Sequence, residues 1–315
     1  MTTPAQFHPD LHALARWLPR GLSPRLLRVL RLVTRLAPNV RLPPGVNVHD
    51  ERVPGHAGAP DVRVRVYMPS ARSGRGPALL WIHGGGYVIG KPEQDDLLCA
   101  KYAVDLGLLV TSVDYRLAPE HPFPAPLDDC YAALKWLSQR ADVAPDRIAI
   151  AGASAGGGLA AALAQRACDV GEIRPAFQAL LYPMLDDRTA TRTDLDGANH
   201  RLWNDRSNLF GWTSYLGQAP GKTDVPAHAV PGRRIDLRGL PPAWIGVGTF
   251  DLFHDEDVSY ANRLREAGVP CELLVVPGAF HGFDAVARTA SVARTFTTNH
   301  LDAVRRALFP ERLAA

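Results

Sequence analysis

The sequence predicts an α/β fold in which helices cover a mostly parallel sheet. Short apolar runs alternate with longer stretches of helical character along most of the chain, and such alternation is typical of a parallel sheet. A chain of 315 residues, of which 46% are hydrophobic and 21% charged, is long enough to bury the core of one such domain. We therefore expect one α/β domain with at most a small accessory element.

The composition argues against several classes of protein. A formal net charge of +3 is too small to indicate a nucleic-acid partner. No apolar stretch approaches the roughly 18–20 residues that a membrane span requires, so we expect no stable membrane insertion. The cysteines lie far apart without C-x-x-C spacing, which predicts free thiols in a reducing, cytoplasmic setting rather than disulfides or zinc ligands. These cysteines are Cys99, Cys130, Cys168 and Cys271.

Residues 1–45 have a character of their own. Their seven arginines are accompanied by a single acidic residue, Asp10. The arginines are Arg16, Arg20, Arg25, Arg28, Arg31, Arg35 and Arg41. Apolar residues recur at helical spacing and arginines line another face of the same helix; the apolar set is Leu22, Leu26, Val29, Leu30, Val33 and Leu36.

This N-terminal pattern allows three interpretations. The absence of a continuous apolar run argues against a signal peptide. A transit peptide or a helix on a membrane surface would have such an Arg-rich amphipathic sequence. We favour a helix that lies over the mouth of an active site with its charges in solvent. Pro38, Pro43, Pro44 and Gly45 are expected to end the segment.

Eight strands are expected after this segment. The first two read as an antiparallel pair, because valines alternate with arginines along the second one. The expected strands are Asn47–Pro54, Val62–Met68, Ala78–Ile82, Leu108–Asp114, Arg147–Ala151, Phe177–Tyr182, Ala243–Val247 and Glu272–Val276. The expected helices are Glu93–Leu106, Leu127–Arg140, Ala155–Ala167, Trp203–Leu216, Phe253–Ala267 and Arg288–Leu308. The proline-rich stretch Tyr115–Pro126 is expected to be irregular.

The strand Arg147–Ala151 runs directly into a Gly-x-Ser-x-Gly sequence, Gly152–Gly156. Such a sequence turns sharply from a strand into a helix and exposes the serine hydroxyl at the turn. Gly152 and Gly156 are needed there because a Cβ at either position would collide with neighbouring backbone. The amino end of the following helix favours developing negative charge. Ser154 is therefore a candidate nucleophile.

A candidate base and a candidate acid follow two later strands. Asp251 comes after Ala243–Val247, and His281, next to Gly282, comes after the last strand. The carboxyl ends of parallel strands meet at one edge of the sheet, where ligands bind. We expect His281 to act as general base toward Ser154 and then as general acid toward the leaving group, while Asp251 holds the imidazole in its tautomer.

Other acidic residues compete for the role of Asp251. Asp255 lies one helical turn further on, but the cluster Asp255–Asp257 is more easily interpreted as a solvated helix face. Asp186 and Asp187 follow the wrong strand. His254 with Asp255 and Asp257 could suggest a metal site, but these side chains would diverge on a helix, and we expect no metal.

The strand Ala78–Ile82 is followed by His83-Gly84-Gly85-Gly86. Glycines let the backbone come close to a substrate carbonyl and direct N–H groups at its oxygen. With the N–H of Ala155, the loop Gly84–Gly86 is expected to form an oxyanion hole, in which Gly85 and Gly86 are the main donors. The loop has neither of the common phosphate-binding patterns. His83 is expected to brace the loop.

Five motifs together resemble the hormone-sensitive-lipase-like carboxylesterases of the α/β-hydrolase superfamily. They are His83–Gly86, Asp114–Glu120, Gly152–Gly157, Asp251–Glu256 and His281–Phe283, in the order and spacing of that family. The resemblance runs from about residue 50 to the end. It implies an eight-stranded α/β-hydrolase fold and a carboxylic ester hydrolase that forms an acyl-enzyme intermediate without a cofactor.

The resemblance also implies a small helical cap. Residues 1–45 would form its N-terminal part, and residues 46–315 the catalytic domain with a cap insertion at about 184–219. The segment Asp114–Glu120 would buttress the oxyanion loop, through Asp114, Tyr115, Arg116 and Glu120. The family usually has Asp or Thr before the nucleophile, whereas this chain has Ala153. We expect altered local support there rather than lost activity.

Aromatic residues suggest which esters would fit. Those of the expected cap and loop would line a pocket for small or medium acyl or alkyl groups, unless they pack cap against core. They are Trp17, Tyr87, Trp203, Phe210, Trp212 and Tyr215. Short- to medium-chain esters of small molecules are the expected substrates. An amidase or a lactonase would use the same three residues. Receptors on this fold lack the catalytic histidine. The presence of His281 therefore argues against a receptor function for this chain. The resemblance also allows a homodimer through the last strand and the closing helix.

Overall fold

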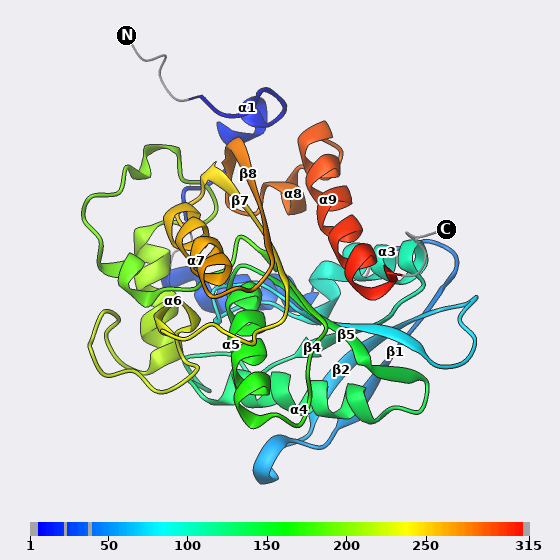
Figure 1. Cartoon of the computed structure of the whole chain (residues 1–315). Coiled ribbons are helices and arrows are strands. Elements are labelled where there is room, and N and C mark those ends of the chain that lie inside the picture. Colours follow the sequence, from blue (N-terminus) through cyan, green and yellow to red (C-terminus); the bar gives the residue numbers. More distant parts are fainter. Residues whose placement is uncertain (1–5, 22–23, 37–39, 311–315) are drawn as a thin grey trace.

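The computed structural model of the chain describes residues 6–21, 24–36 and 40–310, without the side chains of Pro24, Arg28 and Arg35. Leu22 and Pro38, which entered the N-terminal prediction, lie outside the described residues. Figure 1 shows a twisted sheet with helices packed on both sides. No helix in the described ranges is both long and apolar enough to cross a membrane.

Eight strands form one sheet in the order β1-β2-β4-β3-β5-β6-β7-β8. Strand β2 runs antiparallel to both of its neighbours, and the other pairs are parallel. This confirms the expected fold class. The strands are β1 (Val46–Val53), β2 (Val62–Pro69), β3 (Gly76–Ile82), β4 (Leu109–Asp114), β5 (Val143–Ala153), β6 (Phe177–Leu181), β7 (Ala243–Phe250) and β8 (Cys271–Phe280).

Two strands, β5 and β8, extend four residues past a predicted end. Strand β5 begins at Val143 because this residue pairs with Gly76, before a register shift, although charged residues separate it from the apolar run. Strand β8 continues past Pro277 because pairing resumes between Phe250 and Phe280 after a second shift. Both extensions depend on a neighbouring strand, which a local apolar pattern does not report.

Nine α-helices are present in the described ranges. They are α1 (Pro9–Ala15), α2 (Leu27–Leu36), α3 (Asp96–Leu106), α4 (Ala125–Gln139), α5 (Ala155–Val170), α6 (Asp205–Leu216), α7 (His254–Glu266), α8 (Phe283–Val286) and α9 (Ser291–Leu308). Each helix predicted after residue 46 is found, with ends shifted by a few residues.

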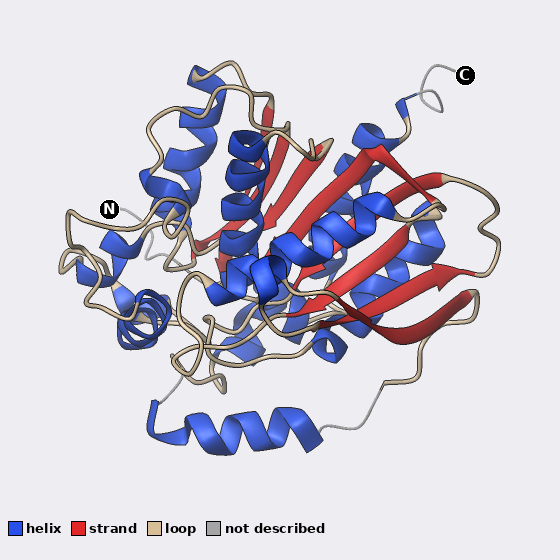
Figure 2. Ribbon diagram, turned by 90° about the horizontal axis from the view of Figure 1, so that it is seen from below, coloured by secondary structure: helices blue, strands red, loops and turns tan. Residues whose placement is uncertain are grey.

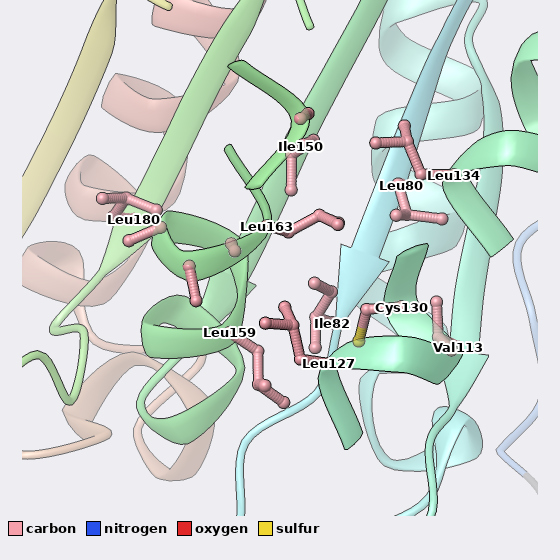
Figure 3. Packing of buried hydrophobic residues seen from close by; sticks show 14 of the residues in the cluster. Leu80, Ile82, Val113, Leu127, Cys130, Leu134, Ile150, Leu159, Leu163 and Leu180 are labelled. Atoms are coloured by element: carbon pink, nitrogen blue, oxygen red, sulfur yellow. The ribbon is translucent and has the colours of Figure 1, made fainter. Parts of the chain in front are cut away.

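Two hydrophobic clusters lie on the two faces of the sheet. Along β3, Leu80 and Ile82 contribute to one cluster, while Leu79 and Trp81 contribute to the other. The first cluster includes residues of α4, α5 and α7, and the second includes residues of α3 and α9. Figure 3 shows how leucines of α4 and α5 meet the β3 side chains. A strand buried on both faces explains the unbroken apolar run at Ala78–Ile82.

The long connection between β6 and β7 holds α6 and several short 3-10 turns. It contacts the N-terminal segment, since the Arg201 guanidinium donates to Ala15 O at 2.6 Å and Leu202 N–H donates to Pro19 O at 2.8 Å. Two segments distant in sequence therefore lie side by side.

The four cysteines are free thiols, as predicted.

Candidate active site

Ser154 occupies the sharp turn between β5 and α5. Its φ of +56° and ψ of −123° are strained for a residue with a Cβ. The turn is fixed by three backbone hydrogen bonds: Ser154 N–H donates to Leu181 O at 2.9 Å, and Ser154 O accepts from Gly158 N–H at 2.9 Å and from Met184 N–H at 3.0 Å.

The glycines of the turn are required by close approaches of backbone. A Cβ on Gly152 would lie 2.3 Å from Gly156 O, and a Cβ on Gly156 would lie 2.1 Å from Ile82 O. Both distances are far below contact, so the Gly-x-Ser-x-Gly pattern follows from the packing of β3, β5 and α5.

The three residues predicted to act together are hydrogen bonded in series. His281 Nε2 lies 2.8 Å from Ser154 Oγ, and His281 Nδ1 lies 2.8 Å from Asp251 Oδ2. Asp251 Oδ1 accepts from Phe253 N–H at 3.0 Å, which fixes the carboxylate. Because a carboxylate only accepts, Nδ1 donates to Asp251 and Nε2 is left to accept the serine proton.

The surroundings of His281 limit its movement. The rings of Tyr182 and Phe253 meet the imidazole edge to face, at centroid distances of 4.9 and 5.2 Å. His281 and Ser154 are each 7% exposed, so both remain within reach of a small molecule while most of the site is shielded from water.

The glycine loop passes directly beside the serine. A Cβ on Gly84 would lie 3.3 Å from Ser154 Cβ. Gly85 and Gly86 adopt φ angles of +128° and +59°, which favour glycine. The indole of Trp203 covers Gly86, where a Cβ would come within 2.1 Å of the ring.

His83 braces this loop in the expected way. Its ring stacks on Tyr115 at a centroid distance of 4.2 Å, and its Nδ1 lies 2.9 Å from Gly84 O. Tyr115 O–H donates to His83 O at 2.9 Å. Complete burial lowers the pKa of His83, which favours the neutral ring.

Two ion pairs hold the segment Asp114–Glu120, which lies next to the glycine loop. Arg116 forms a bidentate pair with the buried Asp129, with N–O distances of 2.8 and 2.9 Å. Arg63 donates to Asp114 at 2.8 Å. Ala118 N–H donates to Tyr87 O at 2.9 Å, which ties the segment to the residue after the glycine loop.

The interpretation of Asp255–Asp257 as a solvated face is wrong for two of its residues. Asp255 pairs with Arg192 at 2.8 Å in partly exposed surroundings, but Glu256 and Asp257 are buried. Glu256 accepts from Leu185 N–H at 2.7 Å and from Thr189 O–H. It therefore anchors the chain after β6, a role that sequence reasoning missed.

Helical phase explains this burial. Asp257 shares the buried side of α7 with Tyr260, Ala261 and Leu264, and this spacing could have revealed it. Burial raises the pKa of both Glu256 and Asp257 well above the ordinary carboxyl range.

Three of the six aromatic residues predicted near the substrate pack against one another. Tyr87 stacks on Tyr215 at a centroid distance of 4.0 Å and contacts Trp212 at 5.5 Å, and all three are buried. Their burial favours the packing alternative. Phe210 is partly buried, and Trp17 is 88% exposed. The ring of Trp203 lies over Gly86 and so contacts the glycine loop.

A cavity of about 350 Å³ lies behind the serine turn, and Ala153 lines it. Two carboxyl groups that the sequence analysis did not single out also line it, Asp95 and Asp284. Asp284 accepts from Tyr182 O–H at 2.7 Å, and Asp95 accepts from the indole N–H of Trp81 at 2.8 Å. Tyr182 thus connects this cavity to the ring of His281.

The described ranges contain no group of three His, Cys, Asp or Glu side chains placed to hold a metal ion. His254, considered in that role, lies 3.0 Å from Asp255 and forms no such group.

Asp95 predicts a pH dependence of stability. Burial raises its pKa to about 6, and Asp284 adds to the rise. A raised pKa means that the folded protein favours the protonated carboxyl. Its contribution to the free energy of unfolding is therefore full below the ordinary pKa of 3.8 and is lost as the pH rises through about 6. Asp95→Asn keeps an oxygen for Trp81. We expect its thermal midpoint to exceed the wild-type value by a few degrees above about pH 6, with no difference near pH 4.

The control for this prediction is Asp61→Asn, at an exposed carboxyl. Thermal unfolding followed by circular dichroism from about pH 4 to pH 8 compares the three proteins. Parallel curves for Asp95→Asn and wild type would contradict the raised pKa.

Comparisons with known proteins agree with this architecture. A family model described as the alpha/beta hydrolase fold matches residues 79–285. Carboxylesterase NlhH of Mycobacterium tuberculosis is 37% identical over 290 residues, which cover 90% of this chain and 88% of the relative. The solved structure of a bacterial heroin esterase matches with a TM-score of 0.89 at 38% identity, covering 96% of this chain and 98% of that one.

Esterase LipW from Mycobacterium marinum matches with a TM-score of 0.83 at 34% identity, over 97% of both chains. These similarities extend over nearly the whole chain and include both sequence and fold. The chain belongs to the hormone-sensitive-lipase-like carboxylesterases of the α/β-hydrolase superfamily.

Proposed function

We propose that this chain hydrolyses carboxylic esters through Ser154, His281 and Asp251, by way of an acyl-enzyme intermediate. The observation that supports this most strongly is the pair of 2.8 Å hydrogen bonds from Ser154 through His281 to Asp251. Nucleophile, base and orienting acid in that order are what acyl transfer by serine requires.

The proposed reaction has two halves. Ser154 Oγ attacks the ester carbonyl carbon while its proton passes to His281 Nε2. The tetrahedral intermediate collapses, the alkoxide leaves with that proton, and the acyl group remains on Ser154. Water then attacks the acyl carbon, giving its proton to His281, and collapse releases the carboxylic acid and returns a proton to Ser154.

Charge on the carbonyl oxygen would be stabilised by the Gly84–Gly86 loop and the N–H of Ala155. The proximity of Gly84 to Ser154 Cβ and the position of Ala155 at the start of α5 support this assignment. One such donor is worth about 3–4 kcal/mol of transition-state stabilisation in comparable sites.

We also propose that residues 1–45 and about 184–219 form a cap over residues of the catalytic domain. The hydrogen bonds from Arg201 to Ala15 and from Leu202 to Pro19 support a common unit. Trp203, on Gly86, would then limit the room for the acyl or alkyl group, so that small esters of short to medium chain length fit best.

Two further expectations remain proposals. A cytoplasmic location agrees with the four free thiols. A homodimer through β8 and α9 agrees with the place of β8 at the end of the sheet, where its outer edge can pair with another copy.

The nucleophile is tested by Ser154→Ala. Because alanine lacks the hydroxyl that would take the acyl group, we expect kcat/KM for p-nitrophenyl butyrate to fall at least about a thousandfold. Ser138→Ala, at a partly exposed serine that donates to Lys135 O, is the matched control and should keep full activity. Substantial activity in Ser154→Ala would overturn the assignment, and a wild-type preference for amides or lactones would change the substrate class.

The cap proposal is tested with p-nitrophenyl esters from acetate to palmitate. We expect the wild-type rate to peak at short or medium chains. Removing the indole with Trp203→Ala should raise the ratio of kcat/KM for decanoate to that for butyrate about tenfold. The control is Trp136→Ala, which removes an indole of α4 that lies under the guanidinium of Arg140. An unchanged ratio in Trp203→Ala would contradict the role of this residue in limiting chain length.

A further inference from the structure

Helix α2 carries an apolar face that the described chain leaves exposed. Five apolar side chains in or next to this short helix are more than half exposed. They are Leu26 at 52%, Val29 at 55%, Leu32 at 56%, Val33 at 59% and Leu36 at 73%. At about 100° per residue, these five fall within an arc of about 120°. This is a continuous apolar face rather than scattered exposure.

The opposite side of α2 is attached to the protein. The guanidinium of Arg31 donates to Val88 O at 2.8 Å and to Ala118 O at 2.7 Å. It also forms a bidentate pair with Glu120, at 2.7 and 2.9 Å. In Figure 2, α2 is the helix along the lower edge, between two grey segments. The apolar face therefore points away from the body, on a helix whose anchor contacts the chain just beyond the glycine loop.

The segment of the chain that carries this face is rich in arginine. Residues 11–49 contain seven arginines and no aspartate or glutamate. Arg31 is paired with Glu120, whereas Arg25 is exposed. A helix that combines an exposed apolar face with an excess of arginine has the properties of a helix that lies in the interface of an anionic bilayer.

We propose that α2 binds the surface of membranes that contain anionic phospholipids. Its apolar face would enter the headgroup region while the arginines contact lipid phosphates. A second copy of this chain is a poorer occupant of the same face, because two arginine-rich segments would repel each other. A helix bound in this way lies on the membrane surface, so no membrane-spanning helix is needed. Because Arg31 joins α2 to Val88 and Ala118, it would hold the region of the glycine loop near the lipid surface.

Vesicle co-sedimentation of the full chain tests the proposal. We expect binding to vesicles of phosphatidylcholine mixed with phosphatidylglycerol at least about tenfold tighter than to phosphatidylcholine alone, and weaker as the salt concentration rises. The double variant Leu32→Gln/Leu36→Gln should reduce the affinity for the mixed vesicles about tenfold. Arg25→Gln should reduce it about fivefold.

The matched control is Ile235→Gln, which changes an apolar side chain that is 94% exposed elsewhere on the chain, and it should bind as the wild type does. Circular dichroism and the thermal midpoint report that every variant is folded. Three results would overturn the proposal: no binding to anionic vesicles, equal binding to both vesicle types, or no effect of the double variant. Self-association in sedimentation velocity that the double variant abolishes, without vesicle binding, would identify a second copy as the occupant.

Discussion

The strained backbone of Ser154 is the constraint on which the site depends. Its positive φ is held by hydrogen bonds with β6 and with the chain that follows it, at Leu181 and Met184. The same turn requires the backbone of Gly156 to touch the end of β3 at Ile82. Strain of this kind persists only where its surroundings fix it. Three neighbouring strands and the first turn of α5 provide that support.

The position of the serine also determines which residues can reach it. Asp251 and His281 follow β7 and β8 at the same edge of the sheet, and the glycine loop follows β3 at that edge. The segment next to the glycine loop is held by the ion pair between Arg116 and Asp129. A rigid environment reduces the reorganisation needed as charge develops on a substrate.

The side of the turn away from the hydroxyl is less filled. Ala153 faces a cavity that also holds Asp95 and Asp284, and Tyr182 links this cavity to the His281 ring. The small side chain before Ser154 thus contributes no polar group to this cavity, which is lined by the carboxyls of Asp95 and Asp284. Support for His281 from this side comes from Tyr182.

Local pattern was sufficient for the strands and for the residues at their ends. Apolar runs such as Ala78–Ile82 are buried on both faces, and the motifs at Ser154, Asp251 and His281 adjoin such runs. Pairing and helical phase were harder to predict. The extension of β8 to Phe280 depends on β7, and the burial of Asp257 depends on which side of α7 meets the core. When tertiary contacts are unknown, a run of three acidic residues is naturally interpreted as solvent-exposed.

Contacts between distant segments had no local signal at all. Asp95 and Asp284 share a cavity although nearly the whole catalytic region separates them in sequence. Arg31 was predicted as one of several solvated charges, yet its guanidinium is partly buried and donates to Val88 O and Ala118 O. Such long-range pairs depend on the completed fold, because residues far apart in sequence meet only through the tertiary structure.

The most direct test of this account is covalent labelling with diethyl p-nitrophenyl phosphate. An activated serine displaces p-nitrophenolate and retains the diethylphosphoryl group. We predict one such group per chain, located by mass spectrometry on the peptide that contains Ser154, with labelling and loss of esterase activity proceeding at the same rate. Inactivation that follows labelling of another residue, or full activity in a chain labelled at Ser154, would contradict the account.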